Sequence, residues 1–290
     1  MPNILITGAN GQLGSELKSL ELAFPEFRFH FFTRETLDIA NADAVHTTFQ
    51  SVQPQFCINC AAYTAVDKAE NEVEQAFNIN EIGVKHLAMA SKANGTKLIH
   101  ISTDYVFDGN GKEPYVETDP TNPVNAYGKT KLAGEKVCLS ENPESIVIRT
   151  SWVYSAFGNN FVKTMLRLMQ TRDALNVVAD QWGIPTYAAH LAQALMVIIN
   201  KDEWKPGLYH FSNAGEPITW YDFAIAIQEY TAAACAVNPI PTVEYPTPAK
   251  RPLYSVMDTN KIVKAFGIPT PEWKQGLHVC LDQLKVQNCW

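Results

Sequence analysis

The sequence has little positive charge and no long apolar run. Its 290 residues include 23 Lys and Arg against 30 Asp and Glu, which gives a formal net charge of −7. A negative balance argues against a protein that holds nucleic acid by bulk electrostatics, although a small anionic ligand needs only a local positive site. No apolar stretch reaches membrane-spanning length, and no basic N-terminal segment precedes a long apolar one. We therefore predict no nucleic-acid partner, no membrane association and a cytoplasmic location.

Cysteine is also scarce, and only Cys57 and Cys60 are close together in the sequence. Their extended segment places them on opposite faces of a strand. A redox or zinc site needs a helix after the first Cys or a second pair of ligands, and the sequence offers neither. We expect all six cysteines to be reduced, mostly buried small hydrophobes; the others are Cys138, Cys235, Cys280 and Cys289.

The first half of the chain alternates apolar segments of strand length with helix-like segments. Continuous apolar runs are typical of strands that are covered on both faces. The predicted strands are 3–7, 27–32, 55–61, 97–102 and 145–150. The predicted helices are 12–22, 42–52, roughly 66–92, and 127–139. Because strands and helices alternate, we predict an α/β fold with a Rossmann-type, doubly wound parallel sheet.

The pattern changes after residue 150, where proline is denser and the spacing of apolar residues is less regular. Residues 237–252 are the segment richest in loop signals. A helix-like run at 188–200 and a strand-like run at 207–212 could return to the first sheet. We predict a nucleotide-binding domain of residues 1–151, with 188–212 returning to it. Residues 152–290 would form a smaller, mainly substrate-binding C-terminal α/β domain, with a cleft between the two.

Three glycines follow the first predicted strand and lead into the first helix. Gly8, Gly11 and Gly14 stand in the spacing G-x-x-G-x-x-G. Glycines at such a turn let backbone amides approach a pyrophosphate at the helix N-terminus. The alternative is a turn that is needed only for packing the helix against the strand. The strand–turn–helix context favours a dinucleotide site.

The second predicted strand ends without an acid. An NAD-preferring site usually has a carboxylate there for the ribose hydroxyl, whereas this chain has Thr33 and Arg34. Arg34 stands where a 2′-phosphate would lie, although a plain solvated arginine is the alternative. We predict NADPH as the cofactor, with NADH also possible.

Tyr127 and Lys131 are four residues apart at the start of a predicted helix. This spacing puts both side chains on one face, about one turn apart. A phenol has a pKa near ~10, so a neighbouring ammonium that lowers this pKa helps it to exchange a proton near neutrality. Such a pair can act in general acid–base catalysis. A chance pair on a helix surface is the alternative.

The predicted strand 97–102 runs into a group of proton-exchanging side chains: Ser102, Thr103, Asp104 and Tyr105. Taken alone, this stretch is typical of a strand that ends in a turn. Together, the glycine turn, this strand end and the Y-x-x-x-K pair resemble the extended short-chain dehydrogenase/reductase superfamily, in its sugar-nucleotide branch. In that superfamily a hydroxyl at this strand end bonds the reacting carbonyl oxygen, and we assign Thr103 to this role and Ser102 to a structural one.

Six segments over roughly residues 3–265 closely resemble the dTDP-4-dehydrorhamnose reductase family. They are STDYVFDG, PVNAYGKTKLAGE, RTSWVYS, FGNNFVKTML, DQWGIPT and AKRPLYSVMDTNK. The resemblance implies reduction of the 4-keto group of dTDP-4-dehydro-β-L-rhamnose by NADPH or NADH, giving dTDP-L-rhamnose. Related 4,6-dehydratases carry Glu where this chain has Tyr105, which argues against water elimination.

The resemblance also implies which residues form the site. The expected catalytic residues are Tyr127, Lys131 and Thr103. The expected cofactor residues are Gly8, Gly11, Gln12, Leu13, Gly14, Arg34, Asp38, Ile39, Ala61, Ala62, Tyr63, Tyr127 and Lys131. The expected substrate residues are Thr103, Asp104, Tyr105, Trp152, Asn160 and Arg251. For Trp152 the alternative to a substrate contact is a tryptophan of the core, and for Arg251 it is a solvated loop arginine. Asn80 resembles another family position, and the alternative there is a buried helix Asn that bonds to the backbone.

Some members of the family are dimers bridged by a metal that glutamates hold. Glu16 lies in the corresponding place, but the C-terminal residues of this chain include no terminal glutamate. We therefore predict no structural metal, and a monomer or homodimer. Two other interpretations stay open: a reductase or epimerase of another nucleotide 4-keto-6-deoxy sugar, and a non-catalytic NADP-binding regulatory subunit. Intact Thr103, Tyr127 and Lys131 argue against the second.

Overall fold

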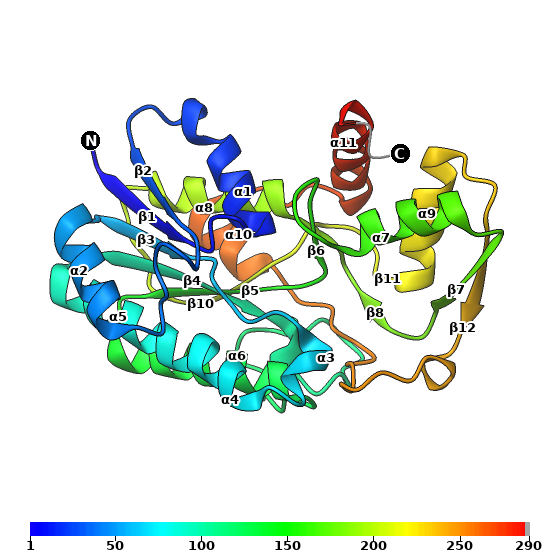
Figure 1. The fold of residues 1–290 in the computed structure, drawn as a ribbon, viewed down its shortest axis with the longest axis horizontal. Helices are drawn as coiled ribbons and strands as arrows, with labels where there is room; N and C mark the ends of the chain where they lie inside the picture. The colour runs from blue at the N-terminus through cyan, green and yellow to red at the C-terminus, as the bar shows by residue number, and fades with distance from the viewer. Residues whose placement is uncertain (288–290) are drawn as a thin grey trace.

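The computed structural model describes residues 1–287, as a six-stranded α/β half and a smaller lobe at the other end of the molecule (Figure 1). The strands are β1 Asn3–Thr7, β2 Arg28–Phe32, β3 Phe56–Asn59, β4 Lys97–Thr103, β5 Ile146–Thr150, β6 Val153–Tyr154, β7 Ala174–Val178, β8 Trp182–Gly183, β9 Thr186–Tyr187, β10 Gly207–Phe211, β11 Ile218–Thr219 and β12 Ala236–Ile240. The α-helices are α1 Gln12–Ser19, α2 Ala42–Val52, α3 Val66–Ala69, α4 Val73–Phe77, α5 Val84–Asn94, α6 Ala126–Glu141, α7 Phe161–Thr171, α8 Ala188–Ile199, α9 Trp220–Thr231, α10 Asn260–Phe266 and α11 Trp273–Val286. Short 3-10 turns are η1 Glu21–Ala23, η3 Asp104–Val106 and η4 Thr242–Glu244, and η2 Asn78–Gly83 is a π-helix.

The main sheet has the strand order β10-β5-β4-β3-β1-β2, and every neighbouring pair in it is parallel. Parallel neighbours need crossover connections, which the helices between the strands supply. The predicted α/β class with a Rossmann-type parallel sheet is confirmed. All six strands point the same way, so their carboxyl ends meet at one edge, where open α/β sheets bind ligands.

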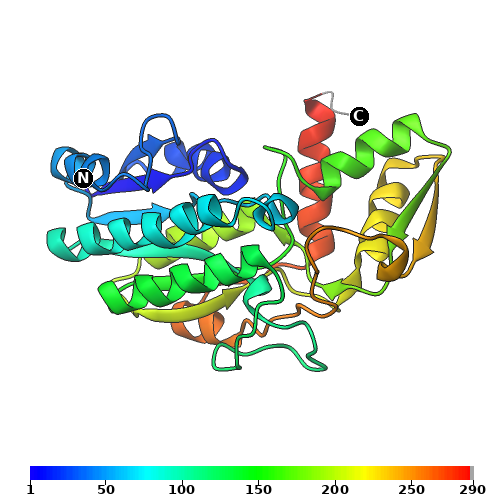
Figure 2. The ribbon, with the colours of Figure 1, turned by 60° about the horizontal axis from the view of Figure 1, so that its bottom comes forward.

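Helices cover both faces of this sheet. Ile4 and Ile6 of β1 face a core that includes residues of α1, α8 and α10. Leu5 between them points to the other face and packs with residues of α2, α5 and α6. Figure 2 shows α5 and α6 lying side by side across this second face. Because both faces are buried, each strand is apolar at successive positions.

The chain leaves the main sheet after β5 and later returns to it. α8 packs in the core on the same face as α1, and β10 then pairs with β5 at the edge of the sheet. The helix and strand expected at 188–200 and 207–212 are therefore present as α8 and β10, one residue shorter at the carboxyl end of each.

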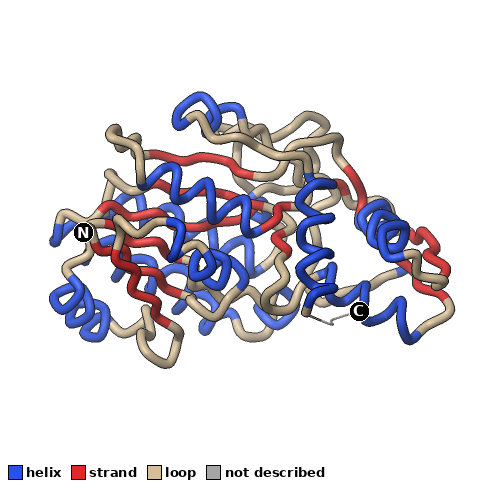
Figure 3. The backbone as a smooth tube through the Cα atoms, turned by 90° about the horizontal axis from the view of Figure 1, so that it is seen from above, coloured by secondary structure: helices blue, strands red, loops and turns tan. Residues whose placement is uncertain are grey.

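The smaller lobe has its own apolar core, formed by α7, α9 and α11 with β7, β9 and β11. Figure 3 separates the long strands of the main sheet from this lobe. Residues 237–252 were expected to be rich in loops, and the structure adds one strand that was not predicted there, since β12 pairs in parallel with β7. Pro239 sits in that strand, which a two-stranded sheet tolerates because both of its strands are edge strands.

A second difference concerns the helix expected at 66–92, which is divided into α3, α4, η2 and α5. The Asn80 amide in η2 accepts from the Tyr63 N–H at 2.9 Å and donates to the Tyr63 carbonyl at 3.1 Å. It also donates to Thr130 Oγ1 at 2.9 Å. Asn80 therefore has a structural role: from the wide π turn, its side chain holds the segment after β3 against α6.

The cysteines within residues 1–287 are free thiols. Cys57 packs on one face of the sheet and Cys60 on the other, as predicted. Cys57, Cys138, Cys235 and Cys280 are buried, and Cys60 is partly buried. The sixth, Cys289, lies outside the described residues.

Candidate active site

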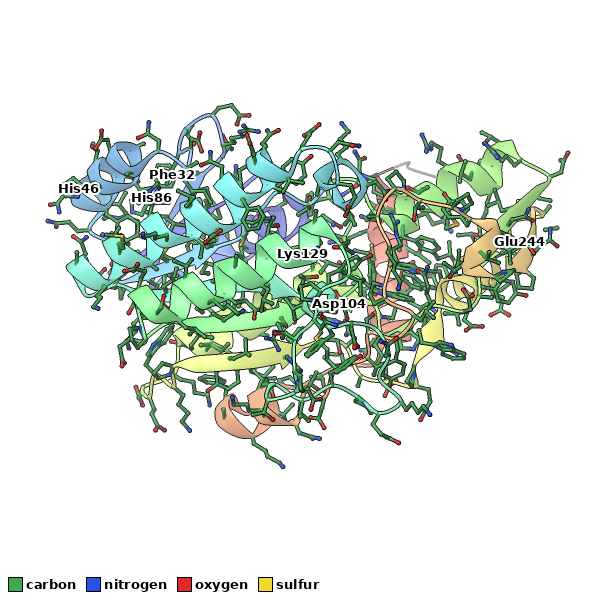
Figure 4. The ribbon with its side chains drawn as sticks, turned by 90° about the horizontal axis from the view of Figure 1, so that it is seen from below. Phe32, His46, His86, Asp104, Lys129 and Glu244 are labelled. Carbon is green, nitrogen blue, oxygen red and sulfur yellow. The ribbon has the colours of Figure 1, made fainter. Side chains whose placement is uncertain are left out.

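A cavity of about 790 Å³ opens at the carboxyl ends of the central strands. Figure 4 shows Asp104, one of the residues that line this cavity, where the sheet half meets the smaller lobe, and His46 and His86 at the far end of the sheet half. All but three of the predicted site residues line this cavity. They are Gly8, Gly11, Gln12, Leu13, Arg34, Asp38, Ile39, Ala61, Ala62, Tyr63, Thr103, Asp104, Tyr105, Tyr127, Lys131 and Trp152. The exceptions are Gly14, Asn160 and Arg251.

The glycine turn forms one end of the cavity. Gly8 has φ +65°, and a Cβ there would lie 2.7 Å from the Ala61 nitrogen. The Gly11 N–H donates to the Gly8 carbonyl at 3.0 Å, which closes the turn. Gly14 lies behind the turn, and a Cβ on it would lie 2.4 Å from the Gly8 carbonyl oxygen. This cradle, which side chains would fill, fits a dinucleotide pyrophosphate at the N-terminus of α1.

Arg34 and Asp38 lie at the same end, after β2. Both side chains are exposed and line the cavity. Among residues 1–287, no carboxylate lies within salt-bridge distance of the Arg34 guanidinium, whereas Asp38 accepts a hydrogen bond from the Ala40 N–H at 3.0 Å. Arg34 is thus free to meet an anionic group.

Tyr127 and Lys131 occupy one face of α6, which begins at Ala126. The Asn125 side chain caps the helix by accepting from the Gly128 N–H at 2.8 Å. The Tyr127 ring meets the Tyr105 ring edge-on, with centroids 5.5 Å apart. Lys131 is 2% exposed, and its Nζ donates to the Ile101 carbonyl oxygen at 2.7 Å. This bond fixes the lysine to β4, and the other two N–H donors of its ammonium stay available for a ligand.

The expected lowering of the Tyr127 pKa by Lys131 is wrong for this structure. Burial raises the pKa of Tyr127 above 10; a hydrogen bond with Thr103 opposes this shift, and the Asp104 charge adds to it. Burial likewise lowers the pKa of Lys131, to about 8, against the attraction of Glu135. Desolvation disfavours both charged forms, so the phenol keeps its proton at neutral pH.

Thr103 and Asp104 end β4 inside the cavity. Thr103 Oγ1 donates to Asp104 Oδ1 at 2.9 Å and accepts from the Tyr105 N–H at 3.2 Å. Within the described part of the chain, Asp104 Oδ2 is buried and has no hydrogen-bond partner. An unpaired carboxylate oxygen in a cavity wall is suited to accept from a ligand hydroxyl. Ser102 instead donates to Glu135 Oε1 at 2.5 Å, in keeping with its predicted structural role.

We expect Asp104→Asn to stabilise the fold at neutral pH. Burial raises the pKa of Asp104 from 3.8 to about 6, so the native state binds more protons than the unfolded state between these pH values. Stability therefore falls as pH rises from about 4 to about 6, and the full penalty persists above that range. Asn does not titrate, so the variant should be more stable by about 1–3 kcal/mol at pH 8.

Urea unfolding of both proteins at pH 4, 6 and 8 checks this prediction. The two free energies of unfolding should converge at pH 4. A difference between the two proteins that does not vary with pH would contradict a titrating Asp104.

Trp152 follows β5 with φ +48°, a backbone conformation that is uncommon for a bulky residue. Its indole stacks on Trp220 with ring centroids 3.5 Å apart. A Cβ on Gly183 would lie 2.5 Å from the Trp152 Cε2 atom, so glycine is needed there. Trp152 thus lines the cavity, but Trp220 covers one of the ring faces that a sugar could use.

Two predicted substrate residues have partners within the protein. The Asn160 side chain caps α7 by accepting from the Lys163 N–H at 3.1 Å and donates to Gln12 Oε1 at 2.9 Å. Arg251 donates to both Asp67 oxygens, at 3.0 and 2.9 Å. Both residues connect the sheet half to the later part of the chain, and neither lines the cavity.

Glu16 is also engaged within the chain. It is 3% exposed, and Ser155 Oγ donates to its Oε1 at 2.6 Å. Among residues 1–287 there is no group of three or more His, Cys, Asp or Glu side chains placed to hold a metal ion. The same residues include no helix that is long and apolar enough to cross a membrane.

Several cavity residues were not predicted. Ser102, Thr150 and Asn159 contribute polar groups, and Thr150 Oγ1 is buried without a partner among the described residues. Thr150 lies beside Thr103 in the sheet register, at the carboxyl end of the adjacent strand β5. Its place as the last residue of a predicted strand was the available signal. The other unpredicted lining residues are Asn10, Leu37, Cys60, Thr64, Ala65, Val66, Ile79, Ile101, Val153, Gly158 and Leu191.

Comparison with known proteins bears on these features. The family described as "RmlD substrate binding domain" matches residues 2–286. The chain is 46% identical over 288 residues to the dTDP-4-dehydrorhamnose reductase of Aggregatibacter actinomycetemcomitans, covering 96% of this chain and 97% of the relative. The structure of a dTDP-4-dehydrorhamnose reductase from Clostridium acetobutylicum superposes with a TM-score of 0.93 at 45% identity, covering 98% of this chain and 99% of the other.

A second solved structure adds a cofactor to the comparison. The dTDP-4-dehydrorhamnose reductase of Bacillus anthracis, in complex with NADP, has a TM-score of 0.93 and 41% identity to this chain, covering 98% of this chain and all of the other. A UDP-glucose 4-epimerase of Thermus thermophilus in complex with NAD shares the fold at 20% identity, with a TM-score of 0.83 over 98% of this chain and 99% of the other. The near-complete coverage, together with the identity above 40%, shows that the chain belongs to the dTDP-4-dehydrorhamnose reductase (RmlD) family.

Proposed function

We propose that this protein reduces the 4-keto group of dTDP-4-dehydro-β-L-rhamnose with NADPH, giving dTDP-L-rhamnose. The observation that carries the proposal is that one cavity is lined by the glycine turn, the Tyr127–Lys131 pair and the Thr103–Asp104 strand end. The family membership supports the choice of substrate. The structure of the Bacillus anthracis relative with NADP supports the choice of cofactor.

The chain's own groups account for the proton and the geometry of this reaction. Bound NADPH supplies a hydride, which adds to the carbonyl carbon. Thr103 has one hydroxyl proton, which it donates to Asp104 in the protein alone. With substrate bound, this hydroxyl would turn to donate to the keto oxygen and so hold it beside Tyr127. Tyr127 then gives its phenolic proton to that oxygen, so hydride and proton together complete the alcohol. Burial keeps this proton on the phenol until transfer, and Lys131 holds the ribose of the nicotinamide nucleotide.

The substrate contacts follow from the free groups of the cavity. We assign the unpaired Oδ2 of Asp104 to a sugar hydroxyl, and Tyr105 and Trp152 to contacts with the sugar and its nucleotide. Asn160 and Arg251 stay predictions for the nucleotide part, and Arg251 would first have to leave Asp67. The division at residues 151 and 152, a cytoplasmic location and a monomer or homodimer likewise stay predictions.

We expect Arg34→Ala to weaken NADPH binding at least 10-fold and NADH binding less than twofold. A charge-assisted contact with the 2′-phosphate contributes about 1.5–3 kcal/mol, and NADH lacks that group. Fluorescence titration of both cofactors measures the two dissociation constants. Arg28→Ala, at an exposed arginine outside the cavity, serves as the control. Equal losses for the two cofactors would exclude the phosphate contact.

A substrate panel tests the proposed function. Purified protein and NADPH are mixed with dTDP-4-dehydrorhamnose, or with a UDP- or dTDP-linked 4-keto-6-deoxy sugar of another configuration. The loss of NADPH absorbance is then followed. We expect the highest kcat/KM with dTDP-4-dehydrorhamnose. A preference for another sugar would favour a related reductase. Binding of NADPH without any turnover would favour the regulatory subunit.

A further inference from the structure

A buried ion pair lies behind Lys131, and the reaction above does not use it. Glu135 is one helical turn after Lys131 on α6 and is only 3% exposed. Arg149 Nε donates to its Oε1 at 2.9 Å, and Arg149 Nη2 donates to its Oε2 at 2.7 Å. Ser102 Oγ also donates to Oε1. Three donors on two oxygens leave this carboxylate little freedom to move.

The arginine of the pair is fixed in its turn. Ser102, Arg149 and His210 are register neighbours on the parallel strands β4, β5 and β10. The guanidinium carbon lies 5.0 Å from the centre of the Phe107 ring, and Nη1 lies 3.5 Å from His210 Nε2. Burial and the Arg149 charge lower the pKa of His210 to about 3, so this histidine is neutral. Ser102, Arg149 and His210 thus form a row of polar side chains across the sheet, and Ser102 and Arg149 bond Glu135 of α6.

Of the ionisable groups around Lys131, Glu135 has the largest effect in favour of the charged form of the lysine. Cys60, Cys138 and Tyr127 have raised pKa values, and His100 has a lowered one, so all four are neutral near pH 7. Glu135 is the largest influence that opposes the effect of burial on the Lys131 pKa. The ionisable and charged groups around the lysine, from α6, the end of β3, β4 and β5, are Tyr127, Glu135, Cys138, Cys60, His100 and Arg149.

A buried ion pair is weak evidence for stability, because apolar side chains of similar volume often replace such a pair at no cost. Glu135 lies one turn from Lys131 on the same face of α6. The two side chains reach adjacent residues of β4, since Lys131 Nζ bonds the Ile101 carbonyl and Glu135 bonds the Ser102 hydroxyl. We propose that Glu135, held by Arg149 and Ser102, is a positioning residue that keeps Lys131 in its charged, proton-bearing form. The inference rests on the proposed function, in which the charge of Lys131 is used. The titration that tests it needs no substrate and is independent of that function.

The test is the titration of Lys131 in wild-type protein and in Glu135→Gln. The ¹³Cε signal of labelled lysine reports ionisation, and a Lys131→Arg spectrum assigns it. We expect the midpoint in Glu135→Gln to fall by about one pH unit, as for loss of a neighbouring opposite charge. The alkaline limb of kcat/KM should move with it, giving about a fivefold loss at pH 8 and near-equality at pH 6.

Two further variants complete the design. Glu141→Gln makes the same change at the last residue of α6, where the side chain is partly exposed and faces Lys85 at 3.9 Å, and it should leave the midpoint unchanged. Glu135→Gln combined with Arg149→Met removes both charges without leaving one unpaired, so it provides a folded protein if the single variant unfolds. Its midpoint should also fall, by less than in the single variant. An unchanged midpoint in a folded variant overturns the proposal. A shifted midpoint in a protein that does not reduce the sugar contradicts only the proposed function.

Discussion

We expect Tyr127→Phe to lower kcat by about 10²–10⁴-fold and to leave NADPH affinity within about twofold. Phe lacks the proton that the keto oxygen must receive, and a positioned general acid contributes a factor of this size. The ring itself is retained, so the edge-on contact with Tyr105 and the packing of α6 persist. Steady-state kinetics with dTDP-4-dehydrorhamnose, and fluorescence titration with NADPH, measure the two effects separately.

Tyr209→Phe is the matched control, because it also removes a phenol. Tyr209 lies outside the cavity, where its hydroxyl donates to the Lys205 carbonyl at 3.0 Å. This variant should keep full activity. If Tyr127→Phe retained more than about a tenth of the wild-type kcat, another group would have to donate the proton.

We expect Gly14→Ala to weaken NADPH binding by about 10- to 100-fold. A Cβ at this position would lie 2.4 Å from the Gly8 carbonyl oxygen and 2.7 Å from the Ala9 Cα. Backbone atoms cannot move aside as the end of a flexible side chain can, so α1 and the turn must separate. Overpacking of this kind costs about 1–3 kcal/mol, and here the distortion falls on the pyrophosphate cradle.

Titration with NADPH measures this loss, and the circular dichroism spectrum shows whether the variant is folded. Ser15→Ala, at the next position of α1, adds no atoms and should bind NADPH as the wild-type protein does. Wild-type affinity in a folded Gly14→Ala variant would show that the close contact behind the turn does not shape the cofactor site.

The fold could be predicted because its signals are local. The alternation of apolar strands with helices reflects burial on both faces of the sheet, which Ile4, Leu5 and Ile6 illustrate. The glycine spacing and the Tyr127–Lys131 spacing likewise depend only on neighbouring positions in one turn or one helix. Strand β12 was missed because Pro239 is a signal for loops, and its pairing with β7 involves a segment some 60 residues away.

The parts of the site that could not be predicted depend on contacts between distant segments. Arg251 meets Asp67, and Trp152 meets Trp220, and neither pairing is encoded by spacing. The pKa of Tyr127 was expected to fall because a lysine is near in sequence. Its actual direction is set by burial, which only the folded chain determines.

The most direct test of the central claim follows the hydride itself. Wild-type protein is incubated with dTDP-4-dehydrorhamnose and NADPH that is dideuterated at C4 of the nicotinamide ring. The product is then analysed by NMR. We expect dTDP-L-rhamnose with a single deuterium, on C4 of the sugar, and one NADPH consumed for each product formed. A product without deuterium at C4, or a product formed without loss of NADPH, would contradict reduction of the 4-keto group.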